Sequence, residues 1–269
     1  MPELPEVEAQ RIWLSRALAG KHIERVRLAR LDHRKGVSRS VFRNLKNVMI
    51  RSVARRGKLL IMHLSDQTDL VIHFGMSGRL VCRKPSEKHD IFGFQTSGQC
   101  WITYNDFRRF GRIWRLGSRN QGRKTVLDTL GPEPLSLAFT AKNILGASNR
   151  PIKQALLDQK IVAGLGNIYV CESLFHAGID PRRLTRSLTQ DELARLVCAI
   201  KRVLKKAVQR GGSTLDDYRG TEGEAGDFDR YFAVYAKEGQ PCPRCTCVGG
   251  VTKITQQARS TFFCATLQR

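Results

Sequence analysis

The sequence predicts an α+β fold in which an N-terminal antiparallel β-sandwich flanked by helices precedes a helical region and a small cysteine-rich β-hairpin. Three observations along the 269 residues predict it. Short β-rich segments separated by turn residues occupy residues 22–116, as in a sandwich or barrel. Amphipathic helical patterns dominate residues 151–209. Half of the eight cysteines lie in residues 242–269.

Changes of sequence character predict the domain boundaries. Gly131-Pro132-Glu133-Pro134 contains two prolines that make a stiff break, so a sandwich domain with an N-terminal helix is expected over residues 1–131. A helical domain is expected over residues 132–230, and the cysteine-rich hairpin over residues 231–269. Residues 212–226 are rich in Gly, Asp, Glu, Ser and Thr, and a loop of that length is usually functional or mobile.

Periodicity predicts the elements of the sandwich domain. Apolar residues from Val7 to Leu18 fall on one helical stripe that ends before Gly20, which predicts a helix. The expected strands share short length, β-branched or aromatic residues and bounding turns. They are His22–Leu28, Val48–Ala54, Lys58–Leu64, Asp69–His73, Arg79–Cys82, Phe92–Thr96, Gln99–Tyr104 and Arg112–Leu116.

Three further helices are expected in the helical domain. Pro151 suits the first turn of a helix that reaches Asp158. A Gly-Leu-Gly turn precedes a second helix over Asn167–Ala177. Thr189 followed by Glu192 has the pattern of a capping box and opens a long amphipathic helix.

The charge balance is strongly basic. The chain has 46 Lys and Arg against 24 Asp and Glu, a formal net charge of +22, spread throughout the sequence. An excess of this size favours nucleic acid or an anionic membrane as the partner. No apolar run approaches the roughly 18–20 residues of a membrane span, and the N-terminus does not resemble a signal peptide. The cysteines do not form a disulfide framework, so a reducing cytoplasmic location is expected.

The C-terminal cysteines have the spacing of a zinc ribbon. Cys242 and Cys245 form one knuckle and Cys264 begins a second, an arrangement in which thiolates close a tetrahedral site. Leu267 stands where the fourth thiolate is expected, and leucine cannot bind zinc. Three alternatives remain open. In the first, Cys247 is a displaced fourth ligand. In the second, three thiolates bind zinc together with water or another group. In the third, the hairpin holds reduced thiols and no metal.

The N-terminus offers a nucleophile. The small residue Pro2 permits removal of Met1, which would leave a secondary amine able to attack a sugar C1′ and form an iminium. An α-amino pKa of about 7.7–8 leaves an appreciable neutral fraction at physiological pH. Glu3, and Glu6 one helical turn later, would place carboxylates beside it for proton transfer. An acidic helix start without catalytic meaning is the alternative.

A basic run and two glycine-flanked loops suit contact with DNA. Arg51–Lys58 gathers positive charge at the head of an apolar strand, where phosphate contact is favoured. Met76, Arg108 and Phe110 lie beside glycines in expected turns. Exposed Met and Phe suit wedges in a base stack, with Arg filling the space of an extruded base. Core packing of Met76 and Phe110 is the alternative.

Seven motifs in register resemble those of the bacterial formamidopyrimidine-DNA glycosylase family, and the resemblance spans essentially the whole chain. The start of the chain resembles this family more than its sister, endonuclease VIII. The motifs are Met1-Pro2-Glu3-Leu4-Pro5-Glu6-Val7-Glu8, Arg56-Gly57-Lys58, His73-Phe74-Gly75-Met76-Ser77-Gly78, Arg108-Arg109-Phe110-Gly111, Leu130-Gly131-Pro132-Glu133-Pro134-Leu135, Gly164-Leu165-Gly166-Asn167-Ile168-Tyr169 and Arg259-Ser260-Thr261-Phe262-Phe263-Cys264.

The resemblance implies a bifunctional DNA repair enzyme with a helix–two-turn–helix domain and a zinc-finger hairpin. Such an enzyme excises 8-oxoguanine and formamidopyrimidines and then cleaves the strand by β,δ-elimination. Pro2 matches the nucleophile that attacks C1′, and Glu3 the acid/base residue. Lys58 matches a lysine of recognition and β-elimination, and Arg259 the arginine that grips phosphate and assists δ-elimination.

The resemblance also implies DNA-contacting residues. Met76, Arg108 and Phe110 match the triad that fills the void in the duplex, with Arg108 facing the orphan cytosine. The residues expected to contact the DNA backbone or the lesion nucleotide are His89, Lys153 and Asn167, with Arg150 added from its charge. Residues 212–226 lie where the family has a loop over the flipped base.

Double-stranded DNA with oxidised purines is the expected partner, and no membrane association is expected. The protein is expected to be a monomer that binds zinc and no organic cofactor. Its expected location is the bacterial cytoplasm, at the nucleoid. Two alternatives remain. One is an endonuclease VIII-like preference for oxidised pyrimidines. The other is a catalytically weak lesion-binding protein with a degenerate finger.

Overall fold

The structure is a computed structural model that describes residues 1–28, 37–99, 101–117, 124–145, 149–213 and 226–269. The chain separates into two units that are each described by themselves. The first unit contains Met1–Thr125 and Arg210–Asp227, and the second contains Val126–Gln209 and Phe228–Arg269. The predicted loop over residues 212–226 falls mostly outside the described residues, which exclude 214–225.

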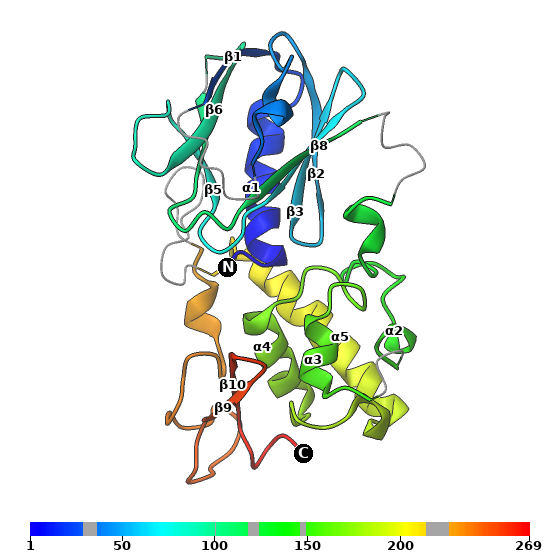
Figure 1. Cartoon of the computed structure of the whole chain (residues 1–269). Coiled ribbons are helices and arrows are strands. Elements are labelled where there is room, and N and C mark those ends of the chain that lie inside the picture. The colour runs from blue at the N-terminus through cyan, green and yellow to red at the C-terminus, as the bar shows by residue number, and fades with distance from the viewer. Residues whose placement is uncertain (29–36, 100, 118–123, 146–148, 214–225) are drawn as a thin grey trace. The chain divides into compact units, whose positions relative to one another are not determined.

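The first unit is an antiparallel β-sandwich with one long helix (Figure 1). Its sheets have the strand orders β2-β3-β4-β8 and β1-β6-β7-β5, and every pairing within them is antiparallel. Its elements are α1 Leu4–Leu18, β1 Ile23–Leu28, η1 Arg39–Phe42, β2 Ile50–Arg56, β3 Leu59–Leu64, β4 Asp69–His73, β5 Arg79–Cys82, β6 Asp90–Thr96, β7 Trp101–Asn105 and β8 Arg112–Leu116.

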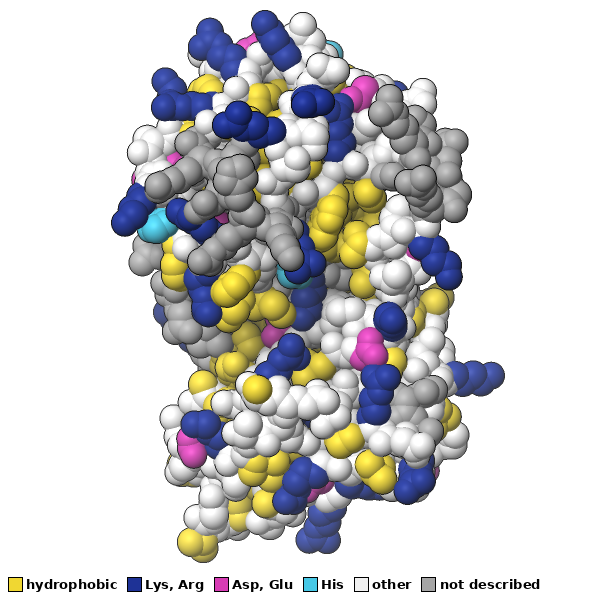
Figure 2. All heavy atoms as spheres, viewed as in Figure 1, with side chains coloured by type: hydrophobic (Ala, Val, Ile, Leu, Met, Phe, Trp, Pro, Cys, Tyr) yellow, Lys and Arg dark blue, Asp and Glu magenta, His cyan; other side chains and the backbone are white. Residues whose placement is uncertain are grey.

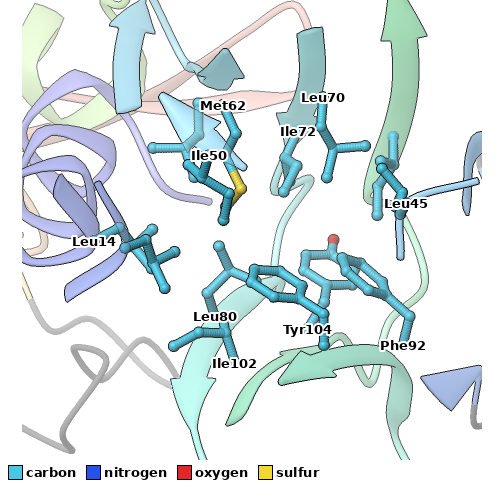
Figure 3. Packing of buried hydrophobic residues seen from close by; sticks show 14 of the residues in the cluster. Leu14, Leu45, Ile50, Met62, Leu70, Ile72, Leu80, Phe92, Ile102 and Tyr104 are labelled. Atoms are coloured by element: carbon cyan, nitrogen blue, oxygen red, sulfur yellow. The ribbon is translucent and has the colours of Figure 1, made fainter. Parts of the chain in front are cut away.

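The core of the first unit lies between the two sheets. Figure 3 shows Met62 and Ile72 from one sheet pointing toward Leu80 and Phe92 from the other. Leu14 of α1 belongs to the same cluster, so the helix is fixed to the sandwich by apolar burial. The predicted sandwich is confirmed, and the bounds of each predicted strand lie within two residues of those of an observed strand.

Helix α1 begins at Leu4, three residues before the predicted start at Val7. Periodicity missed the first turn because polar capping rather than an apolar stripe defines it. The backbone N–H of Glu3 donates to Glu6 Oε2 at 2.8 Å, and the Glu3 side chain accepts from the Glu6 backbone, which makes a reciprocal capping box. Pro5 in the first turn adds a preset backbone angle.

The second unit is helical and ends in a hairpin. Helix α4 packs against α5, α3 and strand β10. Thr189 and Glu192 exchange the two hydrogen bonds of the predicted capping box before α5. The elements are η3 Leu127–Thr129, α2 Ala141–Leu145, α3 Ile152–Leu157, α4 Asn167–Ala177, η4 Thr185–Ser187, α5 Gln190–Gln209, η5 Phe228–Tyr231, β9 Thr252–Gln256 and β10 Arg259–Phe263.

The surface reflects the basic composition. Figure 2 shows Lys and Arg side chains over the face in view, with far fewer Asp and Glu side chains between them. None of the helices in the described part of the chain is both long enough and apolar enough to span a bilayer.

Candidate active site and nucleic-acid interface

The N-terminal segment of the first unit is held in place by carboxylates. Pro2 is buried and Glu3 is 2% exposed, whereas Met1 is 48% exposed. Glu6 Oε1 accepts from the backbone N–H of Ser213 at 2.8 Å and from its hydroxyl at 3.1 Å. Both oxygens of Glu6 therefore accept hydrogen bonds from backbone N–H groups, which fixes the start of α1 to the segment at Ser213. Its part in proton transfer stays a prediction.

Lys58 lies in the turn between β2 and β3 and is 8% exposed. Gly57 precedes it with φ +57°, a conformation that favours glycine in a two-residue hairpin loop. Arg55 donates from Nη1 to the Gly57 carbonyl at 2.9 Å and from Nε to Glu8 Oε2 at 2.8 Å. Arg55 thereby ties the turn that carries Lys58 to helix α1, which carries Pro2 and Glu3 at its start.

Positive charge around the turn affects the neighbouring histidine. Burial, together with the charges of Lys58 and Arg112, lowers the pKa of His73 to about 4. His73 is therefore neutral at physiological pH. Its Nδ1 accepts from the Gly75 backbone N–H at 3.2 Å, which holds the start of the loop that carries Met76.

The predicted wedge residues are exposed at loop tips. Met76 is 42% exposed and Phe110 is 52% exposed, so neither side chain packs in the core. The guanidinium of Arg108 lies 5.5 Å from the centre of the Phe110 ring, a cation–π contact. Phe107, which the sequence did not single out, adds a third exposed apolar side chain at 42%. Apolar groups and a cation at one loop suit contact with unstacked bases.

His89 lies at the end of a turn that Asp90 stabilises. Arg83 donates to both oxygens of Asp90, at 2.7 and 2.8 Å, and the backbone N–H groups of Ser86 and Glu87 donate to Oδ2. Burial raises the pKa of Asp90, but these hydrogen bonds outweigh it and lower the pKa to about 2. His89 Nδ1 is buried without a hydrogen-bond partner among the described residues.

In the second unit, Lys153 and Asn167 brace the hairpin that presents Arg259. Lys153 is fully buried and donates to the Ser260 carbonyl at 3.0 Å and to Thr261 Oγ1 at 2.6 Å. Asn167, at the start of α4, donates to the same carbonyl at 2.9 Å. Burial, with the charge of Arg259, lowers the pKa of Lys153. Arg259 is exposed at the start of β10, so its charge faces solvent.

Glu172 is a supporting residue that the sequence did not reveal. It is completely buried on α4, and its carboxylate accepts from the backbone N–H groups of Ala233, Val234 and Tyr235 at 2.8, 3.0 and 2.9 Å. It thus ties the helix to the segment that leads into the hairpin. Burial raises its pKa. The sequence signal for this role is weak, because it consists only of a glutamate among the apolar residues of a predicted helix.

Arg150 is paired within its own unit. Its Nη1 lies 2.7 Å from Asp158 Oδ2, and 53% of its side chain is exposed. An exposed ion pair of this kind contributes little to stability. Because the Arg150 side chain is exposed, its charge stays accessible from solvent. Its contact with DNA stays a prediction.

Four cysteines of the hairpin converge. The Sγ atoms of Cys242, Cys245, Cys247 and Cys264 all lie within 4.8 Å of one another. Cys247 Sγ lies 3.1 Å from Cys245 Sγ and 3.5 Å from Cys264 Sγ. Zn–S bonds of about 2.3 Å in a tetrahedron put sulfurs about 3.8 Å apart, so this donor set fits zinc. Leu267 packs against the apolar cluster that includes Cys242 and Cys264, and its side chain offers no metal ligand.

The C-terminal tail is fixed without a cysteine at position 267. Gln268 is 1% exposed, accepts from the Cys264 backbone N–H at 2.9 Å and donates to the Ile179 carbonyl at 2.8 Å. These bonds hold the segment after Cys264 against the end of α4, where Gly178 adopts φ +73°.

Two family models match the chain. The formamidopyrimidine-DNA glycosylase N-terminal domain matches residues 1–113, and the formamidopyrimidine-DNA glycosylase H2TH domain matches residues 130–219. Proteins named formamidopyrimidine-DNA glycosylase from Rhodospirillum centenum and Ruegeria pomeroyi are 43% and 41% identical, over 290 and 283 residues. Each comparison covers 100% of both chains.

Solved structures also resemble the chain over nearly its whole length. The MutM (Fpg) protein from Thermus thermophilus has a TM-score of 0.88 and 39% identity over 99% of this chain and 98% of its own. MutM in complex with DNA containing carbocyclic 8-oxo-G has a TM-score of 0.88 and 32% identity. A Lactococcus lactis Fpg mutant in complex with Fapy-dG DNA has a TM-score of 0.89 and 32% identity. The last two comparisons cover 100% of both chains.

Proposed function

The chain belongs to the formamidopyrimidine-DNA glycosylase family, and from this premise we propose that it is a DNA glycosylase of base excision repair that also cleaves the strand as an AP lyase. The full-length similarity to proteins solved with 8-oxo-G and Fapy-dG DNA carries the proposal. The substrates proposed are 8-oxoguanine and formamidopyrimidines in double-stranded DNA. The proposed site of action is the bacterial nucleoid, and the protein acts as a monomer.

The proposed nucleophile is the amine of Pro2 after removal of Met1. The amine attacks C1′ of the damaged nucleotide, and the glycosidic bond breaks so that the base leaves. The nitrogen then loses its proton and the C1′–O4′ bond of the sugar ring opens, which leaves an iminium between the nitrogen and C1′. The iminium acidifies the C2′ proton, so its removal expels the 3′ phosphate. A second elimination releases the 5′ phosphate. One amine therefore accounts for both activities.

Glu3 and Lys58 are the proposed partners of that amine. Glu3 supplies a carboxyl group for proton transfer during base loss and opening of the sugar ring. Lys58 supplies a cation for lesion recognition and for β-elimination. Arg55 supports this assignment because it links the Lys58 turn to helix α1.

The DNA-binding roles divide between the two units. In the first unit, Met76, Arg108 and Phe110 fill the space of the flipped nucleotide, which offsets the lost stacking and pairing. His89 contacts the DNA backbone or the lesion nucleotide. In the second unit the proposed contacts come from Arg259, which assists δ-elimination, and from Lys153, Asn167 and Arg150. The cations of Arg259, Lys153 and Arg150 provide the phosphate attraction that a +22 chain makes available.

Zinc is the proposed resident metal. Cys242, Cys245, Cys247 and Cys264 would hold it, with Cys247 in place of the cysteine that Leu267 replaces. A zinc ion bound by four thiolates supplies no reaction chemistry and stabilises a hairpin too small to hold its shape alone. The braces from Lys153 and Asn167 then keep Arg259 at a fixed place on that hairpin.

The test is an excision assay on duplexes that carry one 8-oxoguanine opposite cytosine, with thymine glycol duplexes alongside. We expect loss of the base and a strand gap with phosphate at both ends, with 8-oxoguanine preferred. Preference for thymine glycol would favour the endonuclease VIII-like alternative. Tight lesion binding without product would favour the lesion-binding alternative.

A further inference from the structure

We propose that Asp106 is a positioning residue that locks together the two loops bearing the duplex-filling side chains. These are the Met76 loop, residues 73–78, and the Arg108 loop, residues 106–111. The inference rests on the proposed function of Met76, Arg108 and Phe110. It adds a buried carboxylate whose hydrogen bonds make the positions of these three side chains depend on one another.

The Asp106 carboxylate bonds to both loops. It is 1% exposed. Oδ1 accepts from the hydroxyl of Ser77 in the Met76 loop at 2.5 Å. Oδ2 accepts from the backbone N–H of Gly111, at the other end of the Arg108 loop, at 2.8 Å. A buried carboxylate that lost these donors would be costly, so the bonds strongly favour this arrangement of the loops.

Ser77 extends the connection to Arg108. Its hydroxyl donates to Asp106 and also accepts from the Arg108 backbone N–H at 3.0 Å. The hydroxyl is therefore used in both directions. It places the backbone of Arg108 relative to the Met76 loop, because Met76 is the residue directly before Ser77.

The two loop backbones touch where the side chains leave them. An added Cβ at Gly75 would lie 2.5 Å from the carbonyl carbon of Phe110. An added Cβ at Gly111 would lie 1.7 Å from the hydroxyl of Tyr104, which is itself 3.4 Å from Asp106 Oδ2. The contact leaves no space for side chains at either glycine, so the loops fit closely around the Asp106 carboxylate.

The Arg108 loop also contains a strained residue that needs such support. Arg109 has φ +57°, in the left-handed region that is unfavourable for residues other than glycine. This turn lets Arg108 and Phe110 on either side of it approach each other, with the cation 5.5 Å from the ring centre. The hydrogen bond from Gly111 to Asp106 closes the turn and helps to retain the strained conformation.

The functional consequence is concerted insertion. When the loops form one rigid piece, Met76 enters the duplex at a fixed distance from Arg108. Discrimination for the base opposite the lesion then depends on the Asp106 carboxylate, although that group does not touch DNA. In Asp106→Asn, an NH2 group replaces one oxygen. In one orientation of the amide, this NH2 group faces the backbone N–H of Gly111, so two donors oppose each other. In the other orientation, the Ser77 hydroxyl loses its acceptor.

The experiment compares the wild type with Asp106→Asn, Ser77→Ala and the control Asp66→Asn. Asp66 also accepts hydrogen bonds within a turn, from Thr68 at 3.1 and 2.6 Å. Its turn is at the opposite end of the β3–β4 hairpin from His73. The primary readout is fluorescence of 2-aminopurine opposite a tetrahydrofuran abasic analogue, which reports insertion without requiring catalysis. The other readouts are 8-oxoguanine excision opposite cytosine and opposite adenine, and lyase cleavage of an abasic site in single-stranded DNA.

We expect Asp106→Asn to weaken the insertion signal and the cytosine-over-adenine preference by about tenfold, the scale of one hydrogen bond to a charged group. Ser77→Ala should change both in the same direction. Cleavage of single-stranded DNA, which has no void to fill, should match that of Asp66→Asn. Unchanged insertion and unchanged preference in both loop variants would overturn the proposal. A wild type that inserts normally but neither excises nor cleaves would overturn the proposed function alone.

Discussion

At the scale of single residues, burial together with the charges around the Lys58 turn sets the protonation of the neighbouring His73. His73 receives a hydrogen bond from Gly75 at Nδ1, which requires that nitrogen to be unprotonated. Burial and the nearby cations Lys58 and Arg112 keep it so by lowering the pKa to about 4. The histidine thus links the proposed catalytic turn to the start of the Met76 loop, and it does so as a neutral group.

We predict that His73 titrates near pH 4 rather than at its ordinary value of 6.5. A depressed pKa in the folded state means that its contribution to stability is complete above pH 6.5 and declines as the pH falls toward 4. NMR titration of the ring protons, assigned with His73→Gln, would measure the pKa. A midpoint for His73 near 6.5 would contradict the account.

Residue types revealed the candidate chemistry, but contacts revealed the supporting residues. Pro2, Glu3 and Lys58 were predicted because their types and motifs indicate a nucleophile and its partners. Arg55 and Asp106 were missed because each acts through partners far away in sequence. Arg55 meets Glu8 across 47 positions, and no local pattern marks such a pair.

At the scale of elements, the hairpin brings four thiols together although Leu267 stands where the fourth cysteine was expected. Cys247 is two residues from Cys245, so three of the four thiols lie in one short turn and only Cys264 comes from beyond the hairpin strands. Gln268 and the packing of Leu267 hold the tail that a fourth cysteine would otherwise fix. The predicted alternative of a displaced ligand is therefore geometrically consistent.

We predict that the purified chain binds a single zinc ion and that Cys247→Ser loses it, with a lower Tm. A zinc ion bound by these thiolates would stabilise the hairpin, so its removal should loosen the Arg259 strand. Elemental analysis and thermal unfolding are the measurements. Cys198→Ser is the matched control, because Cys198 is exposed on α5 and lies outside the cluster. Zinc retained at the wild-type level in Cys247→Ser would disprove its role as a ligand.

Elements with strong local signals were predicted well. The α5 capping box and the strands of the sandwich appear where periodicity and turn residues placed them. Helix α2 was missed because five residues are too few to show an amphipathic period. The first turn of α1 was missed because capping by Glu3 and Glu6, not apolar spacing, defines it.

At the scale of the whole molecule, the chain order does not give the unit boundaries. Residues 210–227 belong with the N-terminal unit, and Ser213 reaches Glu6 across 207 positions. A linear reading divides the chain at composition changes and has no means of finding this return. The contact matters because it joins the segment before residue 214 to the helix that begins beside Pro2.

The basic excess also acquires a purpose at this scale. A net charge of +22 left both nucleic acid and an anionic membrane as possible partners. The family resolves this in favour of DNA, and the proposed contacts in both units use cations for phosphate. Charge nevertheless explains only attraction to DNA. The proposed chemistry depends on one uncharged amine at the start of the chain.

The central claim is that Pro2 becomes the covalent attachment point, and borohydride trapping tests it most directly. The Met1-processed protein would be mixed with an 8-oxoguanine:cytosine duplex, reduced with borohydride, digested and mapped by mass spectrometry. Reduction converts the iminium into a stable amine, so we predict one DNA adduct, on the nitrogen of Pro2. A processed protein that gives no adduct, or an adduct on Lys58 instead, would contradict the account.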